Sequence, residues 1–82
     1  MKASDKLLKL EGHHLTVFKS ADEGQVAVCY EDAWVKDGLF LRGEFGHGVN
    51  FEEACEDYLN IISGKTLVFD VFDGKREEVR VL

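Results

Sequence analysis

The clearest hydrophobic pattern in the chain lies within residues 50–62. Apolar side chains recur there at offsets of 0, 3, 4, 7, 8 and 11: Phe51, Ala54, Cys55, Tyr58, Leu59 and Ile62. This spacing predicts an amphipathic helix with one continuous apolar stripe. Asn50 is a good N-cap, Glu53 follows three residues later as in a capping box, and Gly64 is a natural helix stop.

Short runs rich in β-branched and aromatic residues predict five strands around that helix. They cover residues 14–19, 25–31, 39–45, 66–72 and 76–82. In the second of these runs, Val26, Val28 and Tyr30 share one face, and small apolar residues occupy the other. We therefore expect the second strand at the centre of its sheet.

Turn signals separate these strands. Residues 21–24 predict a turn and residues 31–38 a connection, while Asp37-Gly38 and Asp73-Gly74 are typical of hairpins. Residues 46–48, Gly-His-Gly, form the loosest stretch, whose glycines permit a tight turn from strand to helix.

A short helix is predicted before the first strand, over residues 3–12. Ser4 can cap its N-terminus and Gly12 can end it. About two turns of helix are marginal alone, so its leucines must dock on another element.

These elements predict an α+β fold in one domain, residues 1–82. An antiparallel sheet of four or five strands carries the main helix, residues 50–62, on one face, with the short helix at the N-terminal end. Inward-facing apolar positions form the expected core: Val26, Val28, Tyr30, Leu39, Leu41, Phe51, Ala54, Cys55, Tyr58, Leu59, Ile62, Leu67, Phe69, Val71, Val79 and Val81.

Composition narrows the functional classes. The 82 residues include 16 acids and 10 bases, for a net charge of −6, and 45% are hydrophobic. The chain is too apolar to be disordered, has no membrane-span signal, opens with no secretory pattern, and is too acidic for a general phosphate-binding surface. Cys29 and Cys55 are too few for a disulfide scaffold, so we expect buried free thiols and a reducing, cytoplasmic location.

No motif predicts a metal, a cofactor or a catalytic site. The histidines, His13, His14 and His47, and the two cysteines lack the spacing of metal ligands. The glycines at 43, 46 and 48 precede a helix but lack the lysine of a phosphate-binding loop. His47, between two glycines, is the best single candidate for an exposed functional side chain.

Two features predict a protein-binding surface instead. Trp34 lies in a polar connection, where its indole is either exposed, as is typical of an interface anchor, or folded back over the edge of the sheet. Acidic residues line the polar face of the main helix: Glu52, Glu53, Glu56 and Asp57. Such a ridge is either a solvated helix face or a surface that steers a basic partner.

The stretch from Gln25 to Ile62 resembles HicB-like antitoxin domains. It contains a strand QVAVCYE, a strand LFLRGEF, a glycine loop GHG and a helix FEEACEDYLNII. The basic DNA-binding module that often follows in that family is not matched by the C-terminal hairpin. More broadly, residues 46–82 resemble small uncharacterised proteins of Gram-positive phages and prophages, which implies an accessory role without an established activity.

The leading hypothesis is therefore a non-catalytic protein-binding module of phage or prophage type that regulates a host or phage macromolecule. One alternative is an orphan HicB-like antitoxin half-domain that binds a small toxin. Another is a small hydrolase or nuclease that uses His13, His14 or His47. The last strand, at the sheet edge, also leaves open a homodimer through strand pairing.

Overall fold

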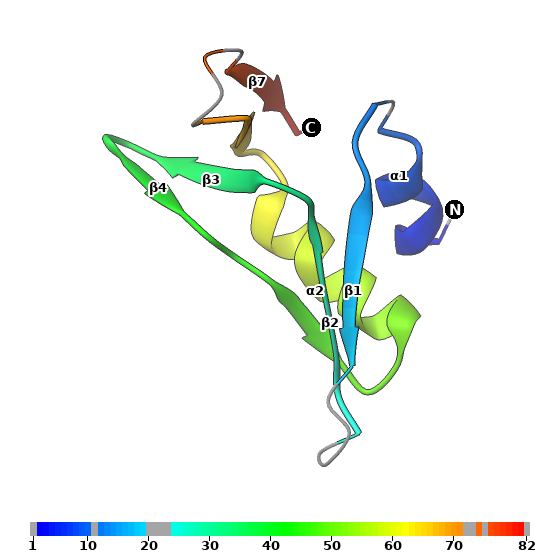
Figure 1. Cartoon of the computed structure of the whole chain (residues 1–82). Coiled ribbons are helices and arrows are strands. Elements are labelled where there is room, and N and C mark those ends of the chain that lie inside the picture. Colours follow the sequence, from blue (N-terminus) through cyan, green and yellow to red (C-terminus); the bar gives the residue numbers. More distant parts are fainter. Residues whose placement is uncertain (1, 11, 20–23, 72–73, 75, 82) are drawn as a thin grey trace.

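The computed structural model describes residues 2–10, 12–19, 24–71, 74 and 76–81 (Figure 1). Two helices and seven strands follow in this order: α1 Ala3–Leu8, β1 Leu15–Lys19, β2 Val26–Tyr30, β3 Ala33–Asp37, β4 Phe40–Arg42, β5 Gly46–Gly48, α2 Phe51–Ile62, β6 Thr66–Phe69 and β7 Glu77–Arg80. The α+β class, the main helix and the short N-terminal helix are confirmed. No helix among the described residues is long and apolar enough to cross a membrane.

The strands form two antiparallel sheets. One has the order β1-β2-β5 and the other the order β4-β3-β6-β7, so β2 is central in its sheet, as expected. Figure 1 shows that the chain bends between β2 and β3, whereas it runs nearly straight from β4 to β5. The bend after β2 falls at Asp32, whose φ of 56° is left-handed, and this break divides the strands into two sheets.

The connection predicted over residues 31–38 is wrong, because most of it is β3. Ala33 pairs with Phe69 and Lys36 with Thr66 in the second sheet. Only Val35 of this strand is fully buried, so the sequence shows little apolar alternation there. The hairpin signal is confirmed: Asp37 pairs with Phe40 across a two-residue turn in which Gly38 has φ 61°.

The loop predicted over residues 46–48 is also wrong, because these residues form β5. Val26 pairs with Gly48 and Val28 with Gly46. A Cβ atom at Gly46 or Gly48 would lie less than 3.0 Å from the backbone of Ala54 in α2. The glycines therefore allow strand and helix to approach closely, and a tight turn is not their purpose.

The two helices start differently. The side chain of Asn50 accepts a hydrogen bond from the Glu53 amide at 2.8 Å, which confirms the cap of α2. The predicted Ser4 cap of α1 is wrong, because the N-cap is Lys2, two residues earlier, and α1 ends at Leu8, well before Gly12. The buried Ser4 hydroxyl donates instead to the Glu52 carboxylate of α2.

The C-terminal strands are shorter than predicted. Asp70, with φ 55°, follows the last residue of β6, and β7 ends at Arg80. Of the two remaining turn signals, residues 21–23 and Asp73 lie outside the described residues.

The core lies between α2 and the facing sides of the two sheets. Its largest buried side chains include Tyr58, Phe69, Ile62, Leu67 and Val28. Tyr30 of β2 is hydrogen-bonded to both helices. Its amide donates to the Tyr58 hydroxyl of α2 at 3.2 Å, and its own hydroxyl donates to the Leu7 carbonyl of α1 at 2.6 Å. Two of the predicted core residues are exposed. Leu39 is 100% exposed at the hairpin tip, and Phe51, 36% exposed, begins α2.

Candidate functional site

The sheet face opposite α2 carries a second set of apolar side chains. Val28 and Tyr30 of β2 are buried in the core, so the alternating residues Ala27 and Cys29 point the other way. Phe18 pairs with Ala27 in the β1–β2 register, and Thr16 pairs with Cys29. Since paired residues share a face, β1 and β2 present an apolar surface that α2 does not cover.

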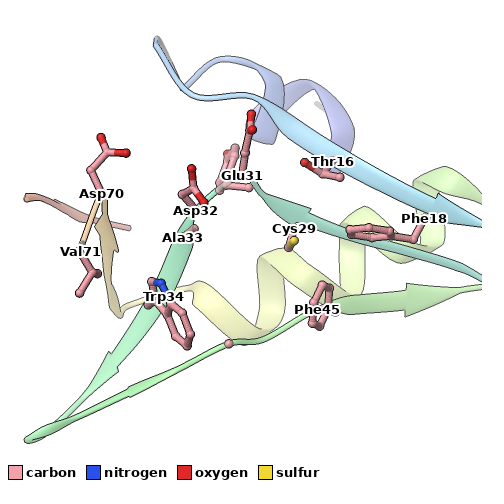
Figure 2. Close-up of a pocket in the computed structure, with 12 residues that line it drawn as sticks. Thr16, Phe18, Cys29, Glu31, Asp32, Ala33, Trp34, Phe45, Asp70 and Val71 are labelled. Atoms are coloured by element: carbon pink, nitrogen blue, oxygen red, sulfur yellow. The ribbon is translucent and has the colours of Figure 1, made fainter. Parts of the chain in front are cut away.

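This surface forms an open groove of about 750 Å³ (Figure 2). Phe18 and Phe45 line it with their rings in edge contact, at a centroid distance of 5.8 Å. Their residues are 49% and 42% exposed, respectively. Two half-exposed aromatic rings in one groove are unusual for a surface that stays in water, and such patches mark interaction sites.

Trp34 forms one wall of the same groove. It belongs to β3, where it pairs with Val68, and it lies on the face opposite to the buried Val35. A Cβ atom at Gly43 would lie 3.6 Å from the indole ring, so the chain passes beside the ring at van der Waals distance. The prediction that Trp34 lies in a connecting loop is wrong, but the structure places the residue among exposed aromatic side chains.

Acidic residues border the groove at one end. Figure 2 shows Glu31, Asp32 and Asp70 toward one side of the pocket and the rings of Trp34 and Phe45 toward the other. Asp32 and Asp70 both adopt left-handed backbone conformations, with φ 56° and 55°. Asp32 precedes Ala33 and Asp70 follows Phe69, and these two residues are paired, so the carboxylates flank the same end of the β3–β6 ladder.

A smaller pocket of about 220 Å³ adjoins this end. It shares the three carboxylates of Glu31, Asp32 and Asp70 with the groove, and His13, His14 and Glu77 complete its polar lining. The His13 ring stacks on Phe69 at 3.7 Å, and its Nε2 atom lies 3.5 Å from Glu77.

The histidines of the hydrolase alternative are only partly brought together. His13 and His14 border the small pocket, whereas His47 lies on β5, beside Phe45. Within the described residues, no three His, Cys, Asp or Glu side chains are arranged to hold a metal ion.

Neither cysteine has the character of a nucleophile. Burial raises the pKa of the Cys55 thiol to about 11, and burial also raises the pKa of Cys29. Both free thiols are therefore protonated near neutral pH, and the thiol is the unreactive form.

The acidic residues of α2 lie on the other side of the molecule from Trp34. α2 turns its apolar stripe toward the sheets, so Glu53 and Glu56, on its polar face, point away from them. Two of the four acids accept hydrogen bonds from other parts of the chain. Glu52 accepts from the Ser4 amide at 3.3 Å and from its hydroxyl, and Asp57 accepts from the His47 amide at 2.8 Å. Of the four acids, Glu53 and Glu56 are exposed and Glu52 and Asp57 are partly buried, so the predicted binding residues do not form one surface.

Hydrogen bonding sets the ionisation of the Glu52 side chain. The bond from the Ser4 hydroxyl lowers the pKa of Glu52 below its ordinary value. The contact of Ser4 with this carboxylate, the α1–α2 clamp, therefore links the two helices.

Sequence reasoning missed Phe18 and Phe45 as site residues. The signal was present, because the strands over residues 14–19 and 25–31 carry apolar side chains on both faces. One helix can cover only one of those faces, so the other had to be exposed or covered by a partner.

Comparison of the chain with family models, with curated proteins and with solved structures gives no match.

Proposed function

We propose that this protein is a non-catalytic protein-binding domain whose partner docks in the aromatic groove. The observation that carries this proposal is the gathering of Trp34, Phe18 and Phe45 in one open pocket. Tryptophan and other aromatic residues dominate the energetics of protein interfaces, because each buries a large apolar area when a partner covers it.

The chemistry of the groove favours a protein over a nucleic acid. Its rim carries Glu31, Asp32 and Asp70, and no lysine or arginine is among the described residues that line it. Aromatic rings can stack on bases, but binding of nucleic acids also requires positive charge against the phosphates. The rim supplies the opposite sign.

The groove is tested by affinity capture from a bacterial lysate with the wild-type protein and the variants Phe18→Thr and Phe45→Thr. Threonine removes the ring at both positions, and at Phe18, which lies in β1, it also keeps the strand propensity. We expect the captured proteins to be lost or strongly reduced for both variants. Leu39→Thr is the matched control, because Leu39 is 100% exposed but lies at the hairpin tip. Unchanged capture by folded Phe18→Thr and Phe45→Thr would refute the proposal.

The acidic face of α2 is a second predicted surface. Charge reversal there is best made at Glu53 and Glu56. Asp57 accepts a hydrogen bond from the His47 amide and Glu52 accepts one from the Ser4 amide, so reversing their charge would also disturb the fold. Loss of capture by Glu53→Lys/Glu56→Lys, with capture unaffected in the groove variants, would assign the partner to α2 instead.

A second candidate is an orphan HicB-like antitoxin half-domain that binds a small toxin, with the chain originating from a phage or prophage. The strands that precede α2 over residues 25–62 support this candidate, although β3 is an additional strand between β2 and β4. The Gly-His-Gly segment counts less in its favour, because it forms β5 instead of a loop. The candidate predicts a small neighbouring gene whose product co-purifies with this chain.

We also propose a location in the cytoplasm. The free thiols of Cys29 and Cys55 support a reducing compartment, which cell fractionation can test.

Self-association through the second sheet is a further part of the proposal. The edges of that sheet are β4 and β7, so pairing of β7 with a second copy would give a homodimer. Light scattering during size-exclusion chromatography would show it as twice the monomer mass.

A further inference from the structure

We infer that the occupant of the groove is a basic peptide segment, with apolar side chains in the aromatic part and an arginine or lysine at the acidic end. This inference rests on the proposed function and adds the chemistry of the partner. It follows from how the two pockets join and from the charges around them.

The aromatic groove and the small pocket form one continuous surface. Glu31, Asp32 and Asp70 line both of them, so the small pocket adjoins the acidic end of the groove. A ligand lying along the groove would have its apolar part against Phe18 and Phe45 and its end against three carboxylates. An extended peptide with an apolar residue followed by a basic one matches this order of surfaces.

The three carboxylates have no basic partner among the described residues. Within the part of the chain that the structure describes, the ion pairs of lysine and arginine join Lys36 to Glu78 and Arg42 to Asp37. Carboxylates that line one end of a groove without a basic partner give that end a negative potential, which a cation bound there would offset. A guanidinium or ammonium group is therefore the complementary ligand.

Other ligands fit the surface less well. No group of three metal-ligating side chains exists among the described residues, so a divalent ion is not favoured. A small polyamine would satisfy the carboxylates but would leave the rings of Phe18 and Phe45 exposed. Only a basic ligand with apolar groups uses both parts of the surface.

The test begins with selection of random 12-residue peptides displayed on phage against the immobilised full chain. We expect the selected peptides to carry an aromatic or aliphatic residue close to an arginine or lysine. The affinity of one synthetic selected peptide is then measured by fluorescence anisotropy for the wild type, for Asp32→Asn/Asp70→Asn and for a control. Asparagine tolerates the left-handed backbone at both positions, so these substitutions remove charge without strain.

We expect Asp32→Asn/Asp70→Asn to raise the Kd roughly 3- to 10-fold, as for the loss of two exposed charge pairs. The control, Glu53→Gln/Glu56→Gln, removes the same number of charges from α2 and should bind as the wild type does. Added salt should weaken wild-type binding more than that of Asp32→Asn/Asp70→Asn.

The two proposals fail in different ways. If the selected peptides lack basic residues, or if Asp32→Asn/Asp70→Asn binds like the wild type while Phe18→Thr and Phe45→Thr lose binding, the groove is a docking site but the basic partner is refuted. If no peptide is selected, or if the peptides bind Phe18→Thr and Phe45→Thr unchanged, both proposals are refuted. Self-association that blocks the groove would identify a second copy as the occupant, which also overturns the inference.

Discussion

The two sides of the sheets are built from similar residues but behave differently. On the α2 side, Tyr30 and Tyr58 are buried and hydrogen-bonded, and Gly46 leaves no space for a side chain beside the helix. On the groove side, Phe18 and Phe45 touch each other but stay about half exposed. Aromatic residues therefore stabilise the fold on one side, whereas on the other they are available to a partner.

The acidic residues on the two sides of the sheets also differ in their contacts. The acids on α2 include two that are used for internal hydrogen bonds, Glu52 and Asp57. The acids of the groove, Asp32 and Asp70, take part in no ion pair with lysine or arginine among the described residues. Unsatisfied charge beside exposed apolar surface is expected at a binding site, because neither feature contributes much to stability.

The largest expected difference between the two sides comes from glycine substitutions. Gly46→Val would push a side chain into the backbone of α2, and we expect it to cost about 3 kcal/mol or more in the free energy of unfolding. Gly43→Ala adds a methyl group at ordinary contact distance from Trp34, and its cost should stay under about 1 kcal/mol. Urea denaturation of both variants measures this; equal costs would mean that the two sides are packed alike.

A smaller difference is expected for single polar groups. Tyr58→Phe would leave the buried Tyr30 amide without its hydroxyl acceptor, which should cost about 1–3 kcal/mol. Thr16→Val on the groove side should change stability by about 0.5 kcal/mol or less. The same urea series tests both, and a neutral Tyr58→Phe would show that the hydrogen bond to Tyr30 does not hold β2 against α2.

Thiol labelling compares the sides without mutation. Cys55 is 0% exposed on the α2 side, so a thiol reagent should not reach it until the protein unfolds. Cys29, half-buried in the groove, should label in the native state. Its labelling should be slower than that of a fully exposed cysteine, because burial raises its pKa. A selected peptide bound in the groove should slow Cys29 labelling further. Native labelling of Cys55 at the same rate as Cys29 would contradict the assignment of the two faces.

The smallest effect is expected at the α1–α2 clamp. Ser4→Ala should lower the midpoint of thermal unfolding by a few degrees at neutral pH, since it removes the hydroxyl that donates to Glu52. The pKa of Glu52 is lowered in the folded state, so this contribution is present above the ordinary value of 4.5 and is lost as the pH falls through the folded value. Melting curves of the wild type and Ser4→Ala should therefore converge in strong acid. A difference that persists there would show that the contribution of Ser4 does not depend on the ionised form of Glu52.

Local patterns predicted the parts of the fold that depend on neighbouring residues. The cap at Asn50, the stripe that ends at Ile62 and the hairpin at Asp37-Gly38 were all confirmed, because each depends on residues a few positions apart. The errors at residues 31–38 and 46–48 arose where distant elements decide the structure. Trp34 lies in a strand because β6 pairs with it, and Gly46 lies in a strand because β2 and α2 surround it.

The candidate site was predicted only in part. Trp34 was identified from its residue type, but the sequence grouped it with acids of α2 that lie on the opposite side of the sheets. Phe18 and Phe45 were missed because they are about 27 positions apart in the chain, and only the pairing of β1, β2 and β5 brings them into contact.

The sequence by itself determined the α+β class, the main helix with its buried stripe, and a surplus of acids over bases. Tertiary structure decided which acids accept hydrogen bonds within the protein, which aromatic rings remain exposed, and that Asp32 and Asp70 both line one end of a groove. The reason is physical: helix periodicity and capping act over a few residues, whereas a strand with two apolar faces does not specify which face a single helix will cover.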